Sequence, residues 1–190
     1  MLRKISVIIA ALFMMSSCAS VGNVPSANEI EEKRQKVLNM RDSSLNDLYK
    51  IRPYLRSRIA QAPGYAVFSD KNVNLVLASF SGGQGVVTSN QTGRNTYMNM
   101  GEIGIGLGLG LKDFRTIFVF NDSATMDKFI NEGWQFGGQA DAAAVDDKDG
   151  GALAGQIVVD NISVYQLTKR GLALQAIVKG TKYWKSPTLN

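Results

Sequence analysis

The spacing of apolar residues changes at Gly64, and this change constrains the fold more than any other feature. Before it, apolar residues have helical spacing, with Leu45, Leu48, Tyr49 and Ile51 on one side of a predicted helix. After it, apolar and polar residues alternate in short runs bounded by glycines and turn residues. These patterns predict an α+β fold, in which N-terminal helices pack on a twisted, mainly antiparallel β-sheet or sandwich.

The helical segment is expected at 29–62. Asn28 is a plausible N-cap for a first helix from Glu29 to Met40, and a second helical stretch begins at about Ser44. Pro53 interrupts this second stretch because a proline nitrogen carries no proton for the helical hydrogen bond.

The β-rich core is expected at 63–186. The runs GYAVFS, VNLVLASF, QGVVTS and TYMNMG are predicted strands, and 90–93 (NQTG) is a predicted hairpin turn. Ser123 is expected to cap a short helix that Gly133 ends. Near the middle of the core, glycines alternate with aliphatic residues at Gly104, Gly106, Gly108 and Gly110. Alternation puts these glycines on one face of a strand, which favours close packing and leaves a groove for an acyl chain or another ligand as the alternative.

The first residues have the features of a bacterial lipoprotein signal peptide, expected at 1–17. Arg3 and Lys4 precede a short apolar stretch, and the small residues Ser16 and Ser17 lead into Cys18, the only cysteine. This ending resembles a lipobox and implies cleavage before Cys18, a diacylglycerol thioether on its sulfur and an acylated amine. Residues 18–28 are then a flexible tether. The expected location is the cell envelope, on the periplasmic face of the outer membrane.

Composition excludes many kinds of enzyme. The chain has no histidine and one cysteine, so catalytic triads with histidine, histidine-ligated metals and multi-cysteine metal sites are ruled out. The expected mature chain has 19 Lys and Arg against 16 Asp and Glu, and this net charge of +3 is too small to indicate nucleic-acid binding. We therefore expect no enzyme activity, no cofactor and no metal.

Basic and aromatic residues gather near the C-terminal end, and they are the candidate lipid-binding residues. Cations beside aromatic rings suit an anionic lipid interface, and a solvated edge that aids solubility is the alternative. The residues are Lys169, Arg170, Lys179, Lys182, Tyr183, Trp184 and Lys185.

Five separated segments resemble the SYLF domain, a lipid-binding and actin-associated module, in its bacterial lipoprotein branch. They are APGYAVFS, GGQGVV, GLGLGLKDFRTIFVFND, GWQFGGQADAAA and YQLTKRGLALQAIVKGTKYWK. The resemblance covers roughly Leu45 to Lys185 and implies binding of anionic lipid. The upstream segment EEKRQKVLNM departs from the family because it is poorly amphipathic. Actin and phosphoinositide binding are not carried over, since a periplasmic lipoprotein would meet neither in its own cell.

The expected function is that of a non-catalytic, lipid-anchored envelope protein that binds anionic phospholipid. The membrane is the expected partner, through the anchor at Cys18 and the basic and aromatic residues. A periplasmic protein-interaction or scaffold module, with sheet edges as the contact, is the alternative.

Overall fold

The structure is a computed structural model that describes residues 25–75, 78–104, 114–135, 143–147, 151–168, 171–172 and 181–190. In these residues the helices are α2 (Ala27–Ile51), α3 (Leu55–Gln61) and α4 (Ser123–Glu132). The strands are β1 (Gly64–Leu75), β2 (Ala78–Ser89), β3 (Asn95–Gly104), β4 (Phe114–Phe120), β5 (Trp134–Gln135), β6 (Ala143–Asp147), β7 (Gly151–Val159), β8 (Ile162–Thr168), β9 (Gly171–Leu172) and β10 (Lys182–Lys185).

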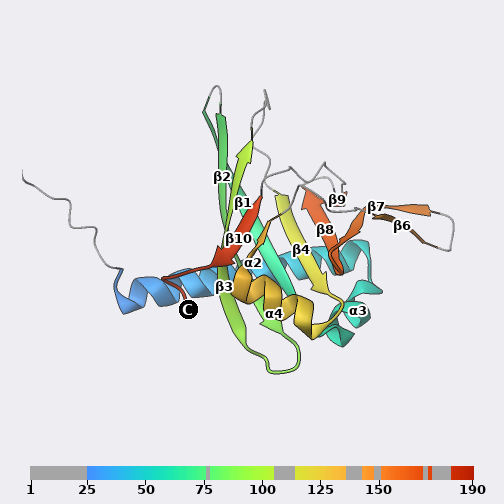
Figure 1. Cartoon of the computed structure of the whole chain (residues 1–190), viewed down its shortest axis with the longest axis horizontal. Coiled ribbons are helices and arrows are strands. Elements are labelled where there is room, and N and C mark those ends of the chain that lie inside the picture. Colours follow the sequence, from blue (N-terminus) through green and yellow to red (C-terminus); the bar gives the residue numbers. More distant parts are fainter. Residues whose placement is uncertain are drawn as a thin grey trace, which may run out of the picture.

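These strands form one curled antiparallel sheet in the order β5-β10-β3-β2-β1-β4-β8-β7-β6, with β9 paired to β8 (Figure 1). The N-terminal helices pack on this sheet, so the predicted α+β class is confirmed. Of the two predicted arrangements of strands, a single sheet or a sandwich, the structure has the single sheet. Strand β10, from the C-terminal end of the chain, lies between β3 and β5. The fold thus brings the basic and aromatic residues of the C-terminal end beside the middle of the sequence.

Helix α2 begins two residues earlier than predicted, because Ser26 rather than Asn28 is its N-cap. Ser26 Oγ accepts the backbone N–H of Glu29 at 3.3 Å, and the Glu29 carboxylate accepts the N–H of Ser26 at 2.7 Å. Two N–H groups that would otherwise lack a helical partner are thereby satisfied reciprocally.

The same helix is continuous, which corrects the prediction of separate helices before and after residue 44. No proline or glycine interrupts α2, and Ser44 Oγ donates to the carbonyl oxygen of Met40 at 2.7 Å. The helix ends before Pro53 as predicted, with Arg52 outside helical geometry at φ −136°.

The β1–β2 and β2–β3 connections are hairpins. The run VNLVLASF, predicted as one strand, is divided between β1 and β2, which pair from Gly64↔Ser89 to Leu75↔Ala78. The predicted turn at 90–93 is confirmed, and Gly93 there has a φ of +68° that favours glycine. Of the alternating glycines, Gly104 ends β3 opposite Ser79. The other three, Gly106, Gly108 and Gly110, lie outside the described residues.

The sheet is covered on both faces. In Figure 1, α4 crosses in front of the strands, while α2 runs behind them. Helix α4 contributes Met126 and Phe129 to a core with Phe68 and Phe118 of the sheet. Helices α2 and α3 cover the other face, in a second core that contains Leu48, Leu55, Ile59, Val67, Ile117, Val119 and Tyr165.

The ends of α4 are set by Asp122 and Gly133. Asp122 is the N-cap in place of the predicted Ser123, and its carboxylate accepts the backbone N–H of Thr125 at 2.7 Å. Gly133 ends the helix as predicted, at a φ of +76°. No described helix is both long and apolar enough to span a bilayer.

Candidate functional site

Strand β10 presents a lysine, a tryptophan and a lysine to the surface. Lys182, Trp184 and Lys185 are exposed, and we call them the β10 surface. Trp184 is 39% exposed and is one of three large apolar side chains exposed in the described parts of the chain. Lys182 and Trp184 lie on one face of the strand, and Lys185, at its end, donates to Asn131 of α4 on the other. An exposed indole on a strand that also exposes two ammonium groups is suited to a polar–apolar boundary.

Tyr183 is not part of this surface, which corrects its inclusion among the candidate lipid-binding residues. Successive side chains of a strand point to opposite faces, so Tyr183 points into the core between its two exposed neighbours. It is 3% exposed, with its ring 4.7 Å from that of Phe68 and 5.2 Å from that of Phe118. Three further candidates, Lys169, Arg170 and Lys179, lie outside the described residues.

The residues after β10 hold this strand against α2. The N–H of Ser186 donates to the carbonyl oxygen of Tyr97 at 3.0 Å, and the side-chain amide of Asn190 donates to the same oxygen at 2.8 Å. Leu189 is buried with Val37 of α2, and its carbonyl accepts Arg34 Nε at 2.8 Å. Trp184 therefore projects from a strand that is fixed on both sides.

A groove of about 660 Å³ lies beside Trp184, between α2 and the sheet. This volume is within the usual range of ligand pockets, ~300–1,000 Å³. Its walls are mostly apolar. The lining residues are Lys36, Val37, Met40, Ser69, Gly82, Gly83, Gln84, Asn99, Met100, Gly101 and Trp184.

Two glycines that pair across β2 and β3 lie in this groove. The indole of Trp184 covers Gly101, where an added Cβ would lie 3.0 Å from its ring. Above Gly82, an added Cβ would meet no heavy atom of the described residues within 4 Å. Trp184 therefore forms one wall of the groove, and Gly82 opens into its free space.

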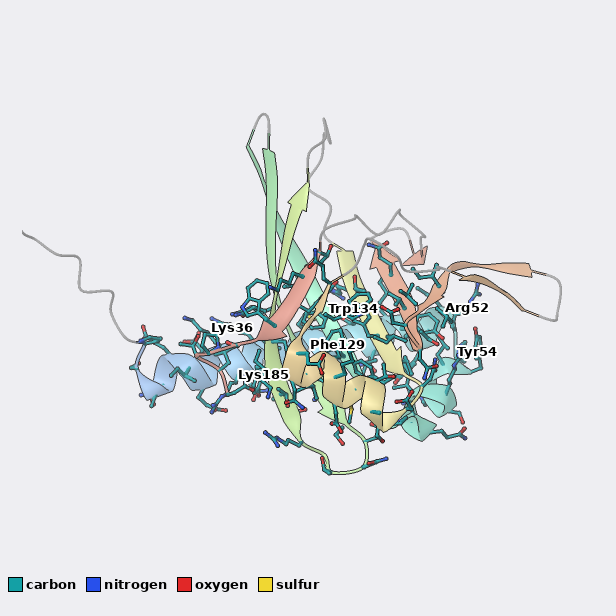
Figure 2. All side chains as sticks on the ribbon, in the orientation of Figure 1. Lys36, Arg52, Tyr54, Phe129, Trp134 and Lys185 are labelled. Atoms are coloured by element: carbon teal, nitrogen blue, oxygen red, sulfur yellow. The ribbon has the colours of Figure 1, made fainter. Side chains whose placement is uncertain are left out.

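The positive charge at the groove and on the β10 surface comes from three lysines. Lys36, on α2, lines the groove and pairs with Glu32 at 2.6 Å in a largely exposed ion pair. Lys182 of β10 pairs with Gly101 of β3, so its side chain lies on the same face of the sheet as Gly101. Lys185 Nζ donates to the neutral Asn131 Oδ1 at 2.9 Å. Figure 2 shows Lys36 and Lys185 toward the N-terminal half of α2, away from Arg52 and Tyr54.

A second exposed cluster, which sequence reasoning missed, lies at the corner between α2 and α3. Ile51 is 38% exposed, although its spacing predicted a place on the buried side, and Tyr54 is 47% exposed. The Arg56 guanidinium stacks 4.5 Å from the centre of the Tyr49 ring, beside Lys50. Ile51 is exposed because α2 ends there, one turn after the buried Leu48. We call Lys50, Ile51, Tyr54 and Arg56 the α2–α3 corner.

The carboxylates near these surfaces have structural contacts. Asp122 caps α4, and hydrogen bonds from Thr125, first its backbone N–H and then its hydroxyl, lower the pKa of the Asp122 carboxyl. Asp160 accepts the indole N–H of Trp134 at 3.1 Å. Among the described residues, no three His, Cys, Asp or Glu side chains are grouped so that they could hold a metal ion.

One buried ionisable side chain lies under α3. Tyr165 is 1% exposed, and within the described structure its hydroxyl has no hydrogen-bond partner. Burial raises the pKa of the Tyr165 phenol to about 12, against a smaller opposing effect of Arg58. The core thus holds Tyr165 in its neutral form.

We expect Tyr165→Phe to flatten the alkaline loss of stability. Because the folded-state pKa lies above the ordinary value of ~10, the unfolded chain ionises first as the pH rises, and stability is lost between pH ~10 and ~12. The variant removes the ionisable group and a buried hydroxyl without a partner, so its stability at neutral pH should equal or exceed that of the parent. Thermal melts from pH 7 to 11 measure the difference; profiles that stay parallel would contradict it.

Comparison with known proteins gives one relative for most of the chain. No protein-family model matches it. The chain is similar to beta cell expansion factor A of Aeromonas veronii, with 31% identity over 154 residues. The match covers 81% of this chain and 58% of the relative, so the chain spans less than two thirds of that protein's length.

Proposed function

We propose that this chain is a non-catalytic, lipid-anchored envelope protein whose folded module binds anionic phospholipid through the β10 surface. The observation that carries the proposal is the exposed indole of Trp184 on a short strand that also exposes Lys182 and Lys185. Amphipathic rings suit the depth of lipid headgroups, and each cation near an anionic bilayer contributes ~1 kcal/mol. Since Lys185 donates to a neutral amide, its charge remains available to a phosphate.

The N-terminal sequence supports a location at a membrane. Lipidation of Cys18 would place Ser26, the cap of α2, eight residues from the bilayer surface. Eight extended residues span at most ~29 Å, so the module would stay close enough to the bilayer for the β10 surface to reach it. The periplasmic face of the outer membrane fits this arrangement.

Reversing both β10 lysines should weaken vesicle binding at least ~30-fold. The reason is that Lys182→Glu with Lys185→Glu removes two favourable charge contacts of ~1 kcal/mol each and adds repulsion. The measurement is sedimentation with phosphatidylglycerol-containing vesicles, using residues 19–190. Ser26 and all three core clusters lie within this span, so it keeps every described contact. Added salt should weaken binding of the parent, because the attraction is screened over ~8 Å at physiological ionic strength.

The matched control is Lys50→Glu with Arg56→Glu at the α2–α3 corner, which changes the net charge equally. It should retain most of the binding. If the corner variant loses binding and the β10 variant does not, the β10 surface is not the lipid contact. If the parent ignores anionic vesicles at low salt but captures a discrete envelope protein, the scaffold alternative replaces the proposal.

A further inference from the structure

The glycine at position 82 has no explanation within the fold. Its φ is not in the left-handed region, and no atom of the described structure lies within 4 Å of a Cβ built on it, so a larger residue would fit there. By contrast, a Cβ on Gly83 or Gly85 would overlap the backbone of β1. Glycine inside a strand lowers stability relative to alanine. Because Gly82 has no side chain, the groove above it stays open. This suggests that the groove holds a ligand.

The walls of the groove indicate an apolar occupant. Trp184 stands on one side, and Met40 with the buried Val37 of α2 lies on the other. The floor consists largely of backbone at Gly82 and Gly101, which allows close approach of a long, flexible chain. The exposed indole continues into the apolar lining of the groove, and contiguous apolar surfaces of this kind mark contact sites.

The rim of the groove carries positive charge. Lys36 lines it from α2, and Lys182 lies on the same sheet face as Gly101. The Glu32 partner of Lys36 is itself exposed, and exposed ion pairs contribute little to stability, so an anionic group can replace it. An apolar groove with a cationic rim is complementary to an acyl chain that ends in a phosphate.

We propose that this groove holds one acyl chain of an anionic phospholipid, with the phosphate at Lys36 and Lys182 and the chain between Trp184 and Met40. This inference rests on the proposed function and specifies it: the module takes up part of a single lipid molecule in addition to adsorbing to a charged surface. Gly82 is the position that admits the chain.

The test uses Trp184 as a local reporter in the full chain. The chain has two tryptophans, so Trp134→Phe leaves Trp184 as the only indole. The probe is a lysophosphatidylglycerol brominated in mid-chain, kept below its micelle concentration so that no bilayer is present. We expect saturable quenching at one probe per chain. Adding Gly82→Phe should weaken this binding more than tenfold without lowering the melting temperature, because the ring has free space to occupy. Gly82→Ala should weaken it less.

Three outcomes would overturn the inference: quenching that does not saturate, equal binding by the Gly82→Phe variant, or binding seen with Cys18→Ser and lost in the lipidated chain. The last would mean that the chain's own acyl anchor occupies the groove. Vesicle sedimentation distinguishes a failure of this inference from a failure of the proposed function. A Gly82→Phe variant that still sediments with anionic vesicles in a salt-sensitive way, but no longer binds the probe, supports both.

Discussion

Replacing Gly85 by valine should lower the free energy of unfolding by about 3 kcal/mol or more. Gly85 pairs with Phe68 across β1 and β2, and a Cβ there would overlap the Phe68 ring and the carbonyl oxygen of Val67. The Phe68 ring cannot move freely, because it packs against Phe118 and Tyr183 at 5.8 and 4.7 Å. For a chain of this size the loss corresponds to a melting temperature lower by about 6–12 °C.

The same strand supplies a matched control. Gly82→Val makes the same chemical change three residues away, where the added atoms meet open space. Its stability should be unchanged or slightly higher, since valine favours strands. Equal melting temperatures for the two variants would show that Phe68 does not lie over Gly85 as described.

Truncating Phe118 to alanine should cost about 3–5 kcal/mol of stability. Phe118 is the hub of the aromatic core: its ring centre lies 5.6 Å from those of Phe129 and Trp134 and 5.2 Å from that of Tyr183. The substitution removes these contacts together and leaves a cavity where the surrounding rings are held by helix α4 and strand β10. Denaturant unfolding measures the loss directly.

Tyr54→Ala is the control for this substitution, because it removes an aromatic ring of similar size from an exposed position. We expect a change within about 0.5 kcal/mol. A loss at Phe118 no larger than that at Tyr54 would contradict the described core. Since β10 joins this core through Tyr183, Phe118→Ala should also weaken vesicle binding at temperatures where the parent is fully folded.

Much of the architecture could be predicted because local chemistry specifies it. Pro53 ends α2, Gly93 permits the β2–β3 turn, and Gly133 ends α4 at a positive φ. The N-cap of α2 was predicted incorrectly because two neighbouring residues can both cap a helix. Asn28 and Ser26 are both acceptable caps, and each has a glutamate three residues later, Glu31 and Glu29; the structure forms the reciprocal pair of Ser26 with Glu29.

The candidate site could be predicted only in part. Lys182, Trp184 and Lys185 can be predicted as candidates from their residue types, and alternation along the strand places Lys182 and Trp184 on the face opposite the buried Tyr183. That alternation was not applied, because four residues are too few to reveal a period of two without knowledge of the neighbouring strands. The α2–α3 corner was missed for a related reason: exposure of Ile51 depends on where the helix ends relative to the sheet.

The sequence by itself determined the fold class, the position of the helical segment before the strands, and the residue types at the C-terminal end. Hydrophobic period, proline and glycine act over a few residues, so these properties can be read locally. Only the tertiary structure decided that β10 pairs with β3, which brings Trp184 over Gly101 and opposite Met40 of α2. The groove exists because α2, three strands from the middle of the chain and β10 from its C-terminal end meet there, and no local pattern encodes which strands will be neighbours.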